Sequence, residues 1–124
     1  MLAKKHRLNL SLEKNSSIFK KENSLFLVSE NFLAYLRPNQ VGLQIACLTS
    51  KTSLSKATLR NFYRRFMYSL VEEKIKDTML SLSTNKFDLV IVLKRNFSDD
   101  KKLLKADFLD LIQKIKNKIN SIHD

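Results

Sequence analysis

The chain has 124 residues, enough for one domain with a hydrophobic core, and its 23 Lys and Arg against 12 Asp and Glu give a formal net charge of +11. Because 44% of the residues are hydrophobic and Gly and Pro occur once each, the composition is that of a folded domain and excludes a disordered basic tail. A folded domain this basic usually binds a polyanion, either a nucleic acid or an anionic membrane surface.

The first half of the chain predicts a helix followed by a small antiparallel sheet. The helix and three strands are expected over about residues 11–21, 25–28, 31–36 and 41–48. Polar turn signals separate the strands, and in the second turn Pro38 fixes a φ angle. Gly42 is expected in the middle of the third strand.

The second half predicts a long helix, a buried strand and a last helix. The long helix is expected over about residues 55–82, either continuous or broken near Asp77, and Ser55 is its candidate N-cap. Its apolar stripe, predicted to face the core, consists of Leu59, Phe62, Tyr63, Phe66, Met67 and Leu70. Residues 87–93 form an apolar run typical of a central strand, and the segment 98–100 should cap the last helix. This order predicts an α+β fold with helices packed on one sheet.

Cysteine usage and hydropathy predict a cytoplasmic protein. Cys47 is the only cysteine, so it can form neither an internal disulfide nor a zinc site, and its apolar neighbours favour a buried thiol in a reducing compartment. No apolar run approaches the roughly 18–20 residues that span a bilayer. We expect a single domain over residues 1–124, in which the basic residues 1–7 are a mobile arm and not a signal peptide.

The sequence offers no catalytic device carried by the protein itself. Its two histidines, His6 and His123, lie close to the termini, where a side chain is poorly placed to act as a rigidly held base. The single glycine excludes a Gly-rich phosphate loop. The pair Asp99-Asp100 is better explained as the start of a helix than as a metal site.

The most informative segment runs from Lys51 to Arg65 and has no acidic residue. Its cations are Lys51, Lys56, Arg60, Arg64 and Arg65. On a helix, positions 56, 60 and 64 form one ridge, Asn61 and Arg65 form a second beside it, and Tyr68 lies one turn beyond position 64. Ordinary solvated helix faces mix charges of both signs, as this chain does later, so the unmixed face favours a phosphate backbone as its ligand.

The same segment resembles the signature helix of the bacterial ribonuclease P protein family. That family's pattern is Ala-x-x-Arg-Asn-Arg-x-(Lys/Arg)-Arg with a further Arg one turn on. Five positions match, namely Ala57, Arg60, Asn61, Arg64 and Arg65. Phe62 replaces the second arginine of the pattern, and Tyr68 stands where the later arginine would be.

The resemblance extends over nearly the whole chain. Similar steps occur in the family's order at residues 6–8, 18–21, 32–35, 41–43, 50–51 and 86–92. It implies a four-stranded sheet flanked by three helices in the order α-β-β-β-α-β-α, with an unusual left-handed β-α-β crossover through the signature helix. Ordinary topology rules would instead predict a right-handed crossover.

The resemblance also implies a function, in which a large RNA subunit with bound Mg²⁺ removes the 5′ leader from precursor tRNA. The protein would bind that RNA subunit and hold the leader in a cleft between the first helix and the sheet. The RNA-binding residues implied are Lys51, Lys56, Arg60, Asn61, Arg64, Arg65 and Tyr68, and those of the leader cleft are Phe19 and Tyr35. No metal or cofactor is expected to be held by the protein alone, which should be monomeric outside the ribonucleoprotein.

Three alternatives stay open. The chain could be an RNA- or ribosome-binding module of the same fold without ribonuclease P activity. It could bind anionic membranes through its last helix, although that helix also carries Asp107 and Asp110 and its apolar stripe is needed for the core. It could be a self-contained nuclease, against which the lack of a rigidly placed histidine or clustered carboxylates speaks.

Overall fold

A computed structural model describes residues 8, 24–39, 42, 44–49, 56–76, 87–94, 97–98 and 100–123. The expected basic arm over residues 1–7 and the expected first helix over residues 11–21 lie outside these residues. The helices and strands are β1 (Leu25–Val28), β2 (Phe32–Pro38), β3 (Gln44–Thr49), α2 (Ala57–Lys76), β4 (Phe87–Leu93) and α3 (Lys101–His123). The described elements therefore follow the order predicted from the sequence, and the α+β class is confirmed.

The four strands form one mixed sheet in the order β1-β2-β4-β3. β1 pairs antiparallel with β2, and β2 pairs antiparallel with β4, so that Phe32 lies opposite Leu93. β3 lies at the edge and runs parallel to β4, with Ile45 opposite Leu89. The long helix α2 connects these two parallel neighbours.

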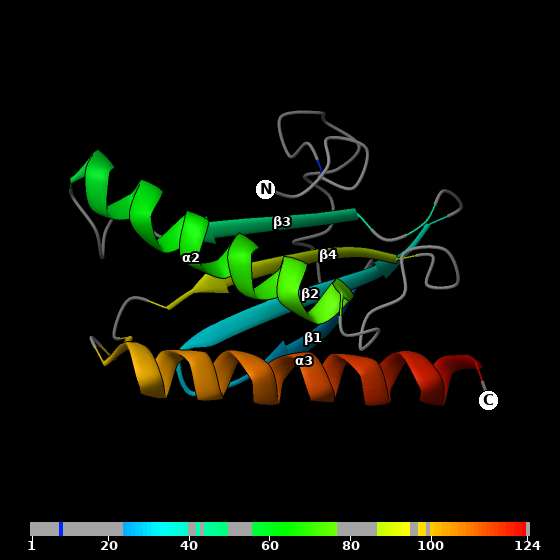
Figure 1. Cartoon of the computed structure of the whole chain (residues 1–124). Coiled ribbons are helices and arrows are strands. Elements are labelled where there is room, and N and C mark those ends of the chain that lie inside the picture. The colour runs from blue at the N-terminus through cyan, green and yellow to red at the C-terminus, as the bar shows by residue number, and fades with distance from the viewer. Residues whose placement is uncertain are drawn as a thin grey trace.

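The β3-α2-β4 connection is left-handed, as the resemblance implied. In Figure 1, α2 lies in front of the sheet, β3 and β4 both run from right to left, and β4 lies below β3. Turned so that the two strands point upward, β4 is to the left of β3 with the helix toward the viewer, which is the uncommon hand.

The core fills the space between one face of the sheet and the two described helices, α2 and α3 (Figure 1). Fully buried side chains from β2, β3 and β4 meet buried side chains from both helices, among them Phe32, Ile45, Leu89, Met67 and Phe108. The ring of Phe32 meets that of Phe108 edge to face, with 5.2 Å between centroids. The helical period predicted for α3 is confirmed at Leu104, Phe108, Leu111, Ile112 and Ile115, all buried.

The opposite face of the sheet carries a smaller apolar cluster. Leu8, Ala46 and Val90 are buried there, and Tyr35, Leu48 and Val92 pack against them half-buried. Because side chains alternate between the faces of a strand, the even positions of β3 and β4 belong to this cluster and the odd positions to the main core.

A buried polar network holds the turn between β2 and β3. The guanidinium of Arg37 donates two hydrogen bonds to Oδ2 of Asp88, over 3.2 Å from Nε and 2.7 Å from Nη2. Asn39 donates to Oδ1 of Asp88 over 2.7 Å and also bridges both backbone groups of Gly42, over 2.8 and 3.0 Å. The turn between the strands is thus anchored to β4 by side chains.

Gly42 was predicted to lie mid-strand, and this prediction is wrong. β3 begins two residues later, at Gln44, and Gly42 has φ of 120°. Glycine can adopt this positive φ because it has no Cβ atom. The one glycine of the chain therefore allows the backbone to turn before β3.

A second network ties the β1–β2 turn to α3. Oδ2 of Asp107 accepts hydrogen bonds from the Ser29 hydroxyl over 2.9 Å and from the Asn31 N–H over 2.8 Å. Asn31 in turn accepts from the Ser98 N–H over 2.8 Å. The predicted cap of the last helix is confirmed at Asp100, whose Oδ1 accepts from the N–H of Lys102 over 2.9 Å. Within the described residues, no helix is long and apolar enough to cross a membrane.

Candidate nucleic-acid interface

Helix α2 extends past the sheet, and this overhang gives its two halves different environments. Figure 1 shows its first turns lying beyond the end of β3. In the second half Met67, Leu70 and Val71 are buried, whereas in the first half Leu59 and Phe62 are 44% and 42% exposed. The prediction that the whole apolar stripe faces the core is therefore wrong at Leu59 and Phe62, because none of the described strands extends beneath the first turns.

The predicted RNA-binding residues gather on this overhanging half and just before it. Lys56, Asn61, Arg64 and Arg65 are exposed, and Arg60 is half-buried. Arg64 donates a hydrogen bond from Nη2 to Oδ1 of Asn61, one turn earlier on the helix. The structure thus brings five of the predicted residues onto one short stretch, while Lys51 lies outside the described residues.

Three of these cations have no carboxylate partner in the described part of the chain. Among the residues that the structure describes, Lys56, Arg64 and Arg65 form no ion pair with Asp or Glu. The first turn of α2 contains no acidic residue, so no carboxylate in that turn offsets the positive end of the helix dipole. Exposed cations, a helix N-terminus and an amide beside an arginine are groups that bind phosphate and sugar oxygens.

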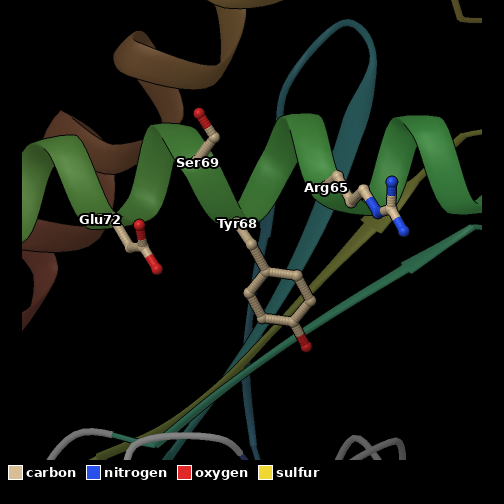
Figure 2. A pocket seen from close by; sticks show the side chains of 4 residues that line it. All are labelled: Arg65, Tyr68, Ser69 and Glu72. Carbon is tan, nitrogen blue, oxygen red and sulfur yellow. The ribbon is translucent and has the colours of Figure 1, made fainter. Parts of the chain in front are cut away.

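Tyr68, the remaining residue of α2 that was predicted to bind RNA, is half-buried, and its side chain points toward the sheet. Figure 2 shows its ring extending from α2 toward the strands, in a pocket lined by Arg65, Tyr68, Ser69 and Glu72. Its hydroxyl oxygen accepts a hydrogen bond from the N–H of Cys47 on β3, over 3.1 Å. Tyr68 therefore contacts the protein itself, and a contact of its ring with RNA stays a prediction.

The outer edge of β3 is covered at two backbone groups. The carbonyl of Ile45 accepts from the N–H of Leu8 over 2.9 Å, and the N–H of Cys47 donates to Tyr68. The Cys47 side chain points into the main core, where burial raises the pKa of its thiol far above the ordinary value of 9.0. The thiol is therefore neutral and unreactive, as expected from its apolar neighbours.

An aromatic cluster lies beside the cations, between α2 and the start of α3. The rings of Phe62 and Tyr63 meet edge to face, with centroids 5.2 Å apart, and Tyr63 meets Phe97 at 4.9 Å. The ammonium of Lys101 lies over the Phe62 ring, 4.6 Å from its centroid. Sequence reasoning missed Lys101 and Phe97, because no local pattern signals a contact between segments so far apart in the chain.

A family model described as Ribonuclease P matches residues 2–117 of the chain. The chain belongs to the ribonuclease P protein family. Helix α2 carries the five positions at which the sequence resembles the family's signature helix, namely Ala57, Arg60, Asn61, Arg64 and Arg65.

Solved ribonuclease P proteins share the fold. The RNase P protein from Thermotoga maritima matches with a TM-score of 0.70 at 21% identity, over 87% of this chain and 96% of that one. The RNase P protein of Staphylococcus aureus matches with a TM-score of 0.62 at 19% identity, over 89% and 94% of the two chains. A mutant of the S. aureus protein with defective mRNA degradation activity matches with a TM-score of 0.63 at 18% identity, over 92% and 90%. No curated protein sequence matches the chain significantly.

Tyr35, which was expected to line the leader cleft, lies on the face of the sheet opposite α2 and α3. It is half-buried, and its ring packs against Phe26 of the neighbouring strand β1, with centroids 5.1 Å apart. Phe26 is 48% exposed and was missed by the sequence reasoning, although the alternation of β1 places it on the same face as Tyr35. Phe19, the second residue expected in this cleft, lies outside the described residues.

A metal site requires carboxylate, histidine or cysteine side chains that lie close together. Among them, no group of three His, Cys, Asp or Glu side chains is placed to hold a metal ion. Asp100, one of the two carboxylates considered in the sequence, caps α3 instead, and Asp99 lies outside the described residues.

Proposed function

We propose that this chain is the protein subunit of ribonuclease P and assists a catalytic RNA in removing the 5′ leader from precursor tRNA. It would bind the RNA subunit through α2 and the leader through the sheet face that carries Tyr35 and Phe26. The observation that carries the proposal is that Lys56, Arg64 and Arg65, on or just before the overhanging half of α2, are exposed and have no carboxylate partner among the described residues, in a member of this family.

The α2 residues would act by holding phosphates. Arg64 and Arg65 can each offer a planar fork of donors to phosphate oxygens, and Lys56 adds a point charge. Because Arg64 already contacts Asn61, the guanidinium is oriented before RNA arrives, so less side-chain freedom is lost on binding. Each phosphate contact releases counterions, which makes the affinity strongly dependent on salt.

The chemistry would be carried by the RNA subunit. Mg²⁺ bound mainly by that RNA supplies the activation of water for phosphodiester hydrolysis. The protein screens phosphate repulsion between the two RNAs, and this lowers the magnesium concentration that assembly requires. On the opposite face of the sheet, the exposed ring of Phe26 and the half-buried ring of Tyr35 can stack on unpaired bases of the leader.

Reconstitution with a bacterial ribonuclease P RNA tests the proposal. At low Mg²⁺, the protein should stimulate cleavage of precursor tRNA by the RNA, and the gain should shrink as either salt or Mg²⁺ rises. If the protein binds other RNAs tightly but gives no stimulation, it is an RNA-binding module without this activity. If the purified protein cuts RNA alone, it is a nuclease in its own right.

A further inference from the structure

The Phe62 ring is exposed, yet it is held in a defined position. Tyr63 supports it edge to face at 5.2 Å, with an interplanar angle of 87°, and Tyr63 is itself supported by Phe97. Lys101 covers one face of the ring from the first residue of α3. A large ring that is 42% exposed contributes little to the core, so its rigid support calls for another explanation.

The charged side chains around this ring are mainly cations. No acidic residue occurs from Lys51 to Val71, and the first turn of α3 also lacks one. Asp100 directly precedes Lys101, but its carboxylate accepts the N–H groups of Lys102 and Leu103, over 2.9 and 3.4 Å. Within the described part of the chain, Lys101 forms no ion pair.

An exposed aromatic ring among cations fits nucleic acid better than protein. The cores of protein–protein interfaces are enriched in aromatic residues but depleted of lysine. Sites for single-stranded nucleic acid combine both features, because bases stack on aromatic rings while cations follow the backbone. A cation over an exposed ring is held weakly, so a base can displace Lys101 from the ring face and leave its ammonium close to the phosphates.

We propose that Phe62 is a stacking platform for an unpaired nucleobase of the RNA partner, and that Lys101 contacts a phosphate of the same strand. This inference rests on the proposed RNA-binding function and extends the interface from α2 onto the start of α3. The RNA opposite Phe62 must then present an unstacked base, which a uniform double helix does not offer.

A tryptophan reporter tests the stacking directly, since the chain contains no tryptophan. The variant Phe62→Trp is titrated with oligouridylate and with an abasic oligonucleotide of the same length and charge. We expect its fluorescence to be quenched by oligouridylate and not by the abasic strand at equal saturation. Gln113→Trp, at an exposed site in the middle of α3 and away from Lys101, is the control and should respond to neither strand.

Affinity measurements provide the second readout. Phe62→Ala should weaken binding of oligouridylate roughly 5- to 100-fold and Phe62→Tyr less than 3-fold, because stacking depends on the ring. Lys101→Gln should reduce the salt dependence of oligouridylate binding, because one phosphate contact is lost. In the double variant Phe62→Trp with Lys101→Gln, oligouridylate should still quench the tryptophan fluorescence, because the ring still stacks on a base. Leu59→Ala removes an equally exposed side chain without a ring and should have little effect.

The outcomes separate this inference from the proposed function. Equal quenching by both strands, or an unchanged affinity of Phe62→Ala, overturns the platform while RNA binding by α2 stands. Loss of self-association by Phe62→Ala, without loss of RNA affinity, overturns it in favour of a contact between copies of the chain. If the unaltered protein binds neither oligouridylate nor ribonuclease P RNA, both proposals fail.

Discussion

The hydroxyl oxygen of Tyr68 on α2 accepts a hydrogen bond from the backbone N–H of Cys47 on β3, with 3.1 Å between the two atoms. It joins the helix that carries the cations to the edge strand of the sheet. Because Cys47 N–H points away from β4, it would otherwise lack a partner within the sheet. Tyr68 thus adds a polar link between α2 and β3 to the apolar contacts of Met67, Leu70 and Val71 in the core.

Removing this hydroxyl should lower stability without disturbing the RNA surface. We expect Tyr68→Phe to reduce the free energy of unfolding by about 1 kcal/mol, the contribution of one hydrogen bond. The ring is retained, so any stacking of position 68 on RNA is retained too, and RNA affinity should stay within about twofold. Urea denaturation and filter binding measure the two quantities. Ser69→Ala, an exposed neighbour in the same pocket, should change neither.

The network at the β2–β3 turn should make Asp88 one of the most sensitive carboxylates of the chain. Its side chain is 7% exposed and pairs at 2.7 Å with Arg37, which is 17% exposed. Asp88→Asn leaves the guanidinium facing a neutral group in a partly buried site, and we expect a loss of about 3 kcal/mol in the free energy of unfolding. Asp110→Asn, in a pair on α3 whose side chains are 49% and 65% exposed, should lose less than about 0.5 kcal/mol. Equal losses would contradict the role of burial.

Because the first half of α2 extends past the sheet, substitution by aspartate should have opposite effects on folding at two positions of its apolar stripe, Met67 and Leu59. Met67 is 1% exposed, so Met67→Asp places a charge in the core and should unfold the protein. Leu59 is 44% exposed, so Leu59→Asp should fold normally and weaken RNA binding by adding a negative charge beside Arg60. Circular dichroism with thermal melting separates the two outcomes. An unfolded Leu59→Asp variant would mean that the first turns of α2 are covered.

The cations of α2 should matter by position and not only by number. Arg60→Ala combined with Arg64→Ala should leave the fold intact, weaken RNA binding and reduce the slope of log affinity against log salt by roughly 1.4 to 1.8. Lys114→Ala with Lys118→Ala removes the same charge from the exposed side of α3 and is the matched control. If both double variants lose affinity equally, net charge alone explains binding and α2 has no special part in it.

Much of the fold could be predicted from the sequence where one physical signal dominated. The strand Phe87–Leu93 has the predicted bounds because a continuous apolar run is typical of a central strand, and all but Val92 are buried. β1 likewise begins and ends as predicted. β2 continues two residues further than predicted, so the prediction that Pro38 lies in the turn is wrong: it is the last residue of the strand, opposite Phe87 of β4.

The errors concern relationships that local patterns do not contain. Helical spacing shows that Leu59 and Met67 share a stripe, but where the strands end decides which of them is covered. The contact of Lys101 with Phe62 joins residues on two helices and leaves no periodic signal. The left-handed crossover came from the resemblance alone, because topology rules favour the other hand. The roles of the cations on RNA stay predictions.

The covered edge of β3 also bears on how the protein behaves before it meets RNA. An exposed edge strand is a template on which a second copy can add its own strand, and such pairing leads to aggregation. Here the carbonyl of Ile45 and the N–H of Cys47 are already engaged by Leu8 and Tyr68. Within the described part of the chain, a backbone amide and a phenol thus occupy two positions on β3 at which the strand of another copy could begin to pair.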